Sequence, residues 1–187
     1  MRARRVLVLY FLSLPWASLA AASTLKVAVY NYAGISSAEL QAAEVETSRY
    51  FRPADINFVW LQCQARRWRR ASCPADFGPR ALVVDLLPRD MASPTLTEGA
   101  LGYAWPGTKI AGVLCAPVGE LADEAQMPRF EVMGMVMAHE IGHLLLGPHS
   151  HARRGIMEPI WEASRLRSLR LGPYFEAGAE RRLAAAG

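Results

Sequence analysis

The residues most suited to chemistry lie in one stretch, AHEIGHLLLGPHSHARRGIMEP, which spans residues 138–159 and holds all four histidines of the chain. His139 and His143 are four residues apart. On a helix they would lie one turn apart on the same face, with about 5 to 6 Å between their Cβ atoms. Two imidazoles at that spacing can bind one metal ion, and Glu140 beside them can reach a metal-bound water without binding the metal. This pattern is typical of zinc hydrolases.

The reaction that this pattern predicts is hydrolysis of a peptide bond. Zinc lowers the pKa of its bound water to about 7, Glu140 takes the proton, and the hydroxide attacks a carbonyl that the same ion polarises. The carboxylate then passes the proton to the leaving amine. A chance occurrence would leave His139 and His143 as ordinary core residues. Because burying an unpaired carboxylate on an apolar helix is costly, metal binding is the favoured interpretation.

The helix that must carry these residues is predicted over the run MPRFEVMGMVMAHEIGHLLLG. The 18 residues between Pro128 and Gly147 contain no helix breaker apart from two internal glycines. Apolar residues nearly encircle this segment, which indicates a buried helix. Gly147 followed by Pro148 is the expected C-terminal stop.

The segments before and after this helix predict strands and short helices. A helix is predicted from an N-cap at Ser36 or Ser37 to Pro53. One or two short surface helices are predicted in the tail, which is broken at Gly172. Alternation and β-branched residues predict the strands, of which the fourth is a weak edge strand. They span residues 25–34, 56–63, 81–88, 100–105 and 109–118.

The first residues, 1–22, have the layout of a secretory signal peptide: three arginines, an apolar stretch, and small residues that permit cleavage after Ala22. A retained membrane anchor is the alternative. The apolar stretch is interrupted by Pro15, however, and is shorter than the roughly 20 residues of a spanning helix. We therefore expect a secreted or periplasmic protein without stable membrane association after cleavage.

Removing the leader leaves 165 of the 187 residues, 23–187, which is enough for a single catalytic domain. Loss of the three leader arginines lowers the formal charge from +4 to +1. A charge this small does not indicate nucleic acid as a partner. We expect a monomer whose partner is a peptide or protein substrate.

Three cysteines in an exported chain predict one disulfide and one free thiol. Cys63 and Cys73 bracket a polar, arginine-rich loop, and closing so short a loop stabilises the fold by about 3 kcal/mol in the chain-entropy model. Cys115 lies in an apolar run and is expected to be buried. Cysteine ligands for a metal are disfavoured because the chain has no close Cys-x-x-Cys pair.

The histidine-rich stretch resembles the active-site region of the metzincin clan of zinc metallopeptidases, and looks closest to small exported bacterial members. In that clan the helix with His-Glu-x-x-His ends at a glycine, a third histidine follows, and a methionine in a tight turn lies under the metal. The matching residues here are His139, Glu140, His143, Gly147, a histidine of the HSH triplet, and Met157.

The resemblance implies an α/β (α+β) fold: a mixed twisted sheet with a backing helix and an active-site helix, then a Met-turn and a short helical C-terminal part. It implies one catalytic Zn²⁺ and Met157 as a hydrophobic floor under the imidazoles. Glu158 stands where some clan members have a tyrosine that assists the metal site.

The third ligand is either His149 or His151, because Gly147 lies one position later than in the clan pattern. The offset from His139 favours His149. One extra residue, however, lengthens the helix by about 1.5 Å and turns its exit by about 100°. Gly-Pro-His then leaves almost no slack, because proline fixes its own φ. Reach therefore favours His151, which is also the ligand position in the similar bacterial proteins.

Two functions follow from these features. The first is a secreted zinc-dependent endopeptidase with Glu140 as general base, whose edge strand within residues 100–105 binds extended substrate by strand addition. The alternative is an exported zinc-stabilised binding module without peptidase activity. A purely structural site has no use for an unligated carboxylate and usually has four protein ligands.

Overall fold

A computed structural model of the chain describes residues 23–63, 65–66, 69–70, 73, 81–91, 99–172 and 174–186. The predicted signal peptide, residues 1–22, lies outside this part of the chain and stays a prediction. The strands are β1 (Ser23–Asn31), β2 (Ile56–Cys63), β3 (Ala65–Arg66), β4 (Arg69–Arg70), β5 (Leu82–Leu87), β6 (Gly102–Trp105) and β7 (Ile110–Leu114). The helices are α1 (Ser37–Phe51), α2 (Cys115–Ala125), α3 (Arg129–Leu146), α4 (Ala163–Leu171) and α5 (Ala177–Ala186).

Five strands form one mixed sheet in the order β2-β1-β5-β7-β6. β1 pairs in parallel with β2 and β5, and β5 pairs in parallel with β7. β6 lies at the edge and runs antiparallel to β7. The prediction of a short edge strand within residues 100–105 is thus confirmed.

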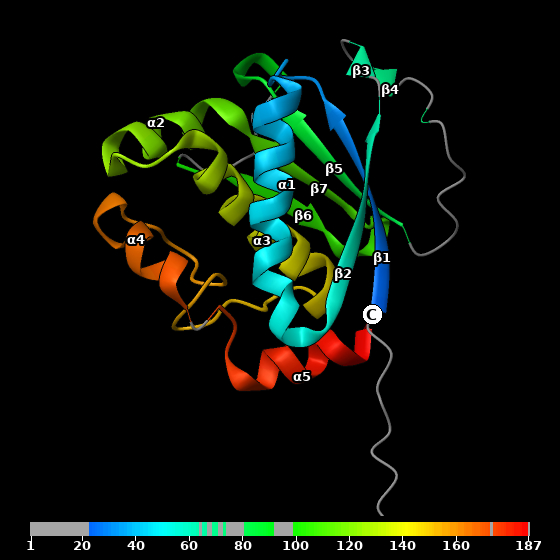
Figure 1. Cartoon of the computed structure of the whole chain (residues 1–187), viewed down its shortest axis with the longest axis vertical. Coiled ribbons are helices and arrows are strands. Elements are labelled where there is room, and N and C mark those ends of the chain that lie inside the picture. The colour runs from blue at the N-terminus through cyan, green and yellow to red at the C-terminus, as the bar shows by residue number, and fades with distance from the viewer. Residues whose placement is uncertain are drawn as a thin grey trace, which may run out of the picture.

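α1 and α3 lie on one face of the sheet and pack against each other (Figure 1). Gly134 of α3 permits this close approach, because a Cβ there would lie 2.7 Å from the Glu46 Cβ and 2.8 Å from the Ala43 carbonyl oxygen. Thr47 donates from its hydroxyl to the Gly134 carbonyl at 3.1 Å. The predicted buried helix is confirmed, and His139, Glu140 and His143 therefore lie on an element of the core.

The start of α1 confirms one prediction and corrects another. Ser36 is the N-cap, since its hydroxyl accepts from the Glu39 N–H at 3.2 Å. The first strand, predicted to reach Gly34, ends at Asn31. The Asn31 side chain binds both the N–H and the carbonyl of Ile35, at 3.0 and 2.7 Å. These side-chain hydrogen bonds stabilise a local turn over residues 31–35, which competes with continued pairing of the strand.

The predicted strand over residues 109–118 is wrong in its second half. β7 ends at Leu114, and Cys115–Val118 is the start of α2, a helix that the sequence analysis did not predict. A short apolar run does not distinguish a strand from a buried helix. Pro117 lies in the first helical turn, where a backbone N–H has no acceptor within the helix, so proline is tolerated there. Cys115 is buried, as expected.

The disulfide between Cys63 and Cys73 is present and joins the end of β2 to the far side of the arginine-rich loop. Within that loop, β3 and β4 form a two-stranded antiparallel ladder. Cys63 packs with Ala28 and Tyr30 on the sheet face opposite α1. The disulfide thus lies on the other side of the sheet from the main core.

The C-terminal part wraps around the helical layer (Figure 1). α4 contacts α2, and α5 contacts α3 and the short 3₁₀ helix Arg52–Ala54. The predicted short helices of the tail are therefore confirmed. In the described part of the chain, no helix has the length and hydropathy needed to cross a bilayer.

Candidate metal centre

α3 places the His-Glu-x-x-His pattern in its last turns. The ring centroids of His139 and His143 are 4.7 Å apart, and their Nε2 atoms are 3.1 Å apart. The helix ends at Gly147 as predicted, where φ is 90° and the N–H donates to the His143 carbonyl at 3.0 Å. A positive φ is accessible to glycine without strain, so the chain can turn back towards the histidines here.

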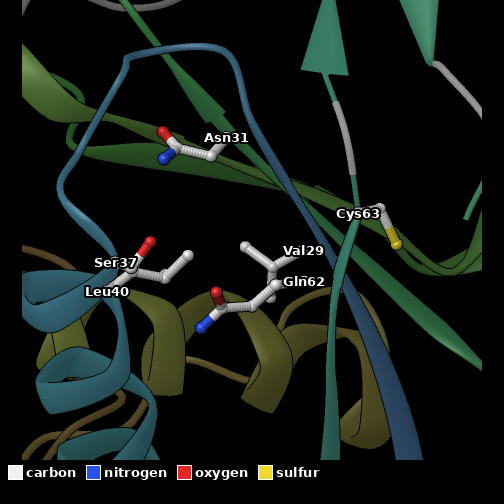
Figure 2. Close-up of a pocket in the computed structure, with 6 residues that line it drawn as sticks. All are labelled: Val29, Asn31, Ser37, Leu40, Gln62 and Cys63. Atoms are coloured by element: carbon white, nitrogen blue, oxygen red, sulfur yellow. The ribbon is translucent and has the colours of Figure 1, made fainter.

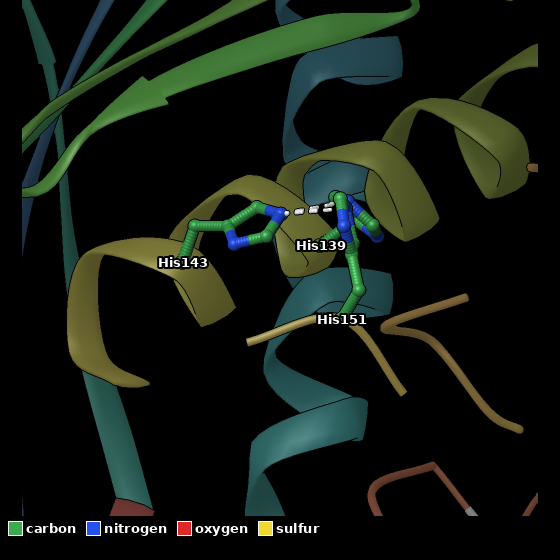
Figure 3. A group of neighbouring side chains, drawn as sticks. All are labelled: His139, His143 and His151. Carbon is green, nitrogen blue, oxygen red and sulfur yellow. Dashed lines mark hydrogen bonds between the residues drawn. The ribbon is translucent and has the colours of Figure 1, made fainter. Parts of the chain in front are cut away.

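The loop after α3 brings His151 to these two imidazoles (Figure 3). The His151 Nε2 atom lies 3.2 Å from the His143 Nε2 atom. One ring nitrogen from each of the three histidines lies within 4.8 Å of the other two. His149 is exposed, has a φ of 61° and lies outside this cluster. The structure thus brings together His139, His143 and His151 and leaves His149 at the surface.

Hydrogen bonds on the outer ring nitrogens turn the Nε2 atoms inward. His139 Nδ1 lies 2.7 Å from the Ile156 carbonyl oxygen, which can only accept, so Nδ1 carries the proton. His143 Nδ1 lies 2.9 Å from the Ser150 hydroxyl. The Ser150 hydroxyl can accept from His143 Nδ1, and in that arrangement both Nε2 lone pairs face one another, which is repulsive unless a cation lies between them. Ligands at about 2.0 to 2.1 Å around a tetrahedral zinc ion stand about 3.3 Å apart, so the three nitrogens fit one Zn²⁺.

Burial lowers the pKa of His139 and of His143 to about 4. Neighbouring imidazoles add to this effect, while the bond from His139 to Ile156 opposes it. Both rings are therefore neutral at pH 7. This is the form in which imidazole binds a metal.

Glu140 lies beside the cluster with 6% of its surface exposed. Burial raises the pKa of its carboxyl group to about 8. The edge strand runs directly against it, because a Cβ at Gly102 would lie 2.8 Å from Glu140 Oε1. A buried carboxylate next to a metal site is suited to proton transfer.

A tight turn places Met157 against α3. The Glu158 N–H donates to the Gly155 carbonyl, and the Glu158 carboxylate accepts from the Gly155 N–H, both at 3.2 Å. A Cβ at Gly142 would lie 2.5 Å from the Met157 sulfur, so the thioether packs directly on α3. Glu158 also forms an ion pair with Arg165 at 3.2 Å. Glu158 therefore closes the turn.

Sequence reasoning missed three neighbours of the cluster. These are the Ile156 carbonyl, the Ser150 hydroxyl and the indole of Trp161, whose centroid lies edge-on at 5.5 Å from that of His139. A backbone carbonyl leaves no signal in a sequence. The only signal for Ser150 was its place between two histidines.

A separate cavity of about 260 Å³ lies between the N-terminal end of α1 and the ends of β1 and β2 (Figure 2). It is lined by Val29, Asn31, Ser37, Leu40, Gln62 and Cys63. Its amides are already engaged, that of Asn31 with Ile35 and that of Gln62 with Glu44. Among the described residues, the histidine cluster is the one group of three potential metal ligands.

Comparison with known proteins supports the fold. No protein-family model and no curated protein matches the sequence. The crystal structure of a zinc-dependent peptidase from Methanocorpusculum labreanum matches with a TM-score of 0.59 and 16% identity, over 84% of this chain and 99% of that one. The archaemetzincin from Methanopyrus kandleri matches with a TM-score of 0.57 and 16% identity, over 87% and 95% of the two chains. The expected metzincin-like mixed α/β fold is thus confirmed.

Proposed function

We propose that this protein is a secreted zinc-dependent endopeptidase. The observation that carries the proposal is the convergence of three imidazole Nε2 atoms beside a buried carboxylate that is not part of the cluster. Three histidine ligands leave one position open for water or substrate, as in catalytic zinc sites. The similar fold of the Methanocorpusculum labreanum protein, described as a zinc-dependent peptidase, supports this proposal.

In the proposed reaction, His139, His143 and His151 would hold one Zn²⁺ through Nε2. The bound ion would supply Lewis acidity towards the peptide carbonyl and the attacking water. Glu140 accepts the proton from the water and passes it to the leaving amine. Its burial excludes competing solvent, and a nearby cation would favour its charged form.

The edge strand β6 is the proposed binding site for the substrate backbone. β6 is the last strand in the order of the sheet, and an edge strand is the element to which an extended peptide adds. Gly102 at the start of β6 lies against Glu140, which places this edge next to the proposed base. A peptide bound along β6 would thus pass the histidine cluster, as an endopeptidase requires.

Secretion is proposed from the predicted leader over residues 1–22 and is consistent with the Cys63–Cys73 disulfide. Expression of the full chain in a secreting host should yield protein whose N-terminus is Ser23. Retention of residues 1–22 on a membrane-bound product would contradict export with cleavage.

The enzymatic proposal is tested with purified, zinc-loaded protein on casein and on a peptide library. We expect cleavage within peptides, loss of activity with a chelator, and recovery with zinc. The binding-module alternative predicts a full complement of zinc and no cleavage. That result, with correctly folded protein, would reject the endopeptidase.

A further inference from the structure

A chain of three short hydrogen bonds connects α1 to His139. Arg49 of α1 donates from Nη1 to the Tyr174 hydroxyl at 2.7 Å. The Tyr174 carbonyl accepts from the Ile156 N–H at 2.7 Å. The Ile156 carbonyl in turn accepts from His139 Nδ1 at 2.7 Å. These bonds link α1, the segment before α5 and the segment before α4 to α3, where the His139 ring is part of the histidine cluster.

We propose that Arg49 and Tyr174 are positioning residues for the metal centre. They hold Ile156, Ile156 sets the orientation and tautomer of the His139 ring, and metal affinity depends on both. This inference rests on the proposed function in that the cluster must bind zinc. It does not require that the protein cleave peptides.

Arg49 is a rigid starting point for this chain of contacts. Its Nε and Nη2 atoms donate to the two carboxylate oxygens of Glu46 at 3.0 and 2.5 Å. Its guanidinium lies over the rings of Tyr50 and Tyr174, 4.9 and 5.2 Å from their centroids. Glu46 and Tyr50 are both buried. A planar guanidinium fixed in this way directs Nη1 towards the C-terminal part, where it donates to the Arg170 carbonyl at 3.0 Å as well as to the Tyr174 hydroxyl.

Ile156 needs such support because no helix or strand includes it. It lies in the irregular segment between α3 and α4, and its side chain is fully buried. Its N–H is held by Tyr174 and its carbonyl by His139, so the two bonds clamp the residue from both sides. A shift of Tyr174 therefore passes through Ile156 to the His139 ring.

Tyr174 also lies in an irregular segment, between α4 and α5. Its ring packs edge-on against Tyr50, with centroids 4.7 Å apart. The neighbouring Phe175 is buried and packs against Phe51, with ring centroids 5.2 Å apart. Phe175 anchors the segment by apolar contact, while the hydroxyl of Tyr174 adds a directional bond to Arg49. Tyr174→Phe therefore removes the hydrogen bond to Arg49 and keeps the apolar anchor at Phe175.

A purely structural role is the competing explanation, and the chain offers a matched control. Arg170 forms an ion pair with Glu131 at 3.2 Å and so also ties the C-terminal part to α3. The side chain of Arg170 is not part of the bonds that link Arg49, Tyr174 and Ile156. Arg170→Gln removes the ion pair but keeps the backbone carbonyl of residue 170 that accepts from Arg49, so it loosens the same region without breaking the proposed chain.

The experiment compares Arg49→Gln, Tyr174→Phe and Arg170→Gln with the wild type. The zinc Kd is measured by competition with a chelator, the ligand geometry by the absorption spectrum of the Co²⁺ form, and stability by the unfolding temperature of the metal-free protein. Direct partners of ligand histidines contribute 10- to 100-fold to metal affinity. Arg49 and Tyr174 lie further from the ligand ring than such direct partners. We therefore expect the zinc Kd to rise about tenfold in Arg49→Gln and about threefold in Tyr174→Phe, with an altered Co²⁺ spectrum in both variants.

We expect Arg170→Gln to lower the unfolding temperature and to keep the wild-type Kd and spectrum. Wild-type zinc affinity in Tyr174→Phe and Arg49→Gln would overturn the inference, and so would an equal loss in Arg170→Gln. If Arg49→Gln does not fold, the zinc Kd of Tyr174→Phe tests the inference alone. This variant lacks only one oxygen atom and should therefore fold. A wild type that binds no zinc overturns the proposed function as well, whereas a wild type that binds zinc but is inactive overturns only the peptidase.

Discussion

The two sides of the candidate metal centre are held by different means. His139 and His143 share α3, a buried helix of 18 residues, and their spacing follows from helix geometry. His151 lies in an exposed loop, and this loop is held by contacts such as the one between Ile156 and Tyr174. One side is thus determined locally, while the other depends on residues distant in the sequence.

The largest expected effect is on the helix side. Glu140→Gln removes the proposed base and leaves all three histidines, so zinc content should stay stoichiometric while kcat falls about a thousandfold. Steady-state kinetics and metal analysis of the same preparation check both halves. Activity close to the wild-type value would mean that another group acts as base.

The second effect separates the two loop histidines. His151→Ala should weaken zinc binding by about a hundredfold or more, because it removes one of three converging Nε2 atoms. His149→Ala is the matched control and should keep stoichiometric zinc, since His149 lies at the surface. A metal-free His149→Ala beside a zinc-replete His151→Ala would reverse this assignment.

A third substitution tests whether the position of Glu140 on α3 depends on its contact with Gly102 of β6. A Cβ at Gly102 would lie 2.8 Å from Glu140 Oε1 and 2.7 Å from the Gly112 carbonyl oxygen, so either Glu140 or β6 must move. Gly102→Ala should lower kcat about tenfold with zinc retained, because small displacements of a catalytic group are costly. Gly107→Ala is the control, since its Cβ would meet nothing within 4 Å. Equal activities of the two variants would show that β6 does not position Glu140.

The smallest effect is the pH dependence of stability in the metal-free protein. For His139 and His143 the folded pKa of about 4 lies below the ordinary 6.5, so the unfolded state binds more protons and stability falls as pH drops below 6.5. For Glu140 the folded pKa of about 8 lies above the ordinary 4.5, so stability falls as pH rises from 4.5 through 8.

Two histidines outweigh one glutamate below pH 6.5, and Glu140 acts alone above it. These groups therefore predict maximal stability near pH 6.5. Thermal unfolding of chelator-treated protein across this range checks the maximum. Glu140→Gln should flatten the decline between pH 6.5 and 8, and an unchanged decline would show that other groups cause it.

Much of the fold could be predicted from the sequence because its signals are local. The apolar run that ends at Gly147 predicted α3, and the pair Ser36 and Ser37 predicted the start of α1. The strand-to-helix change at Cys115 could not be predicted, since a short apolar run fits either element. The burial of Cys115 was nevertheless expected, because it depends on apolarity alone.

The sequence by itself determined that two histidines and a glutamate share one helix, because they lie in an apolar run that no proline interrupts. It also determined that the two histidines share one face of that helix, because they are four residues apart. Whether His149 or His151 joins them was decided by the tertiary structure. The path of the loop depends on the turn at Gly147 and on the backbone bonds of Ile156, and neither a φ angle nor a carbonyl contact is written in residue types. The same holds for Arg49 and Tyr174, which are 125 residues apart in the sequence and meet only because α1 and the C-terminal part pack together.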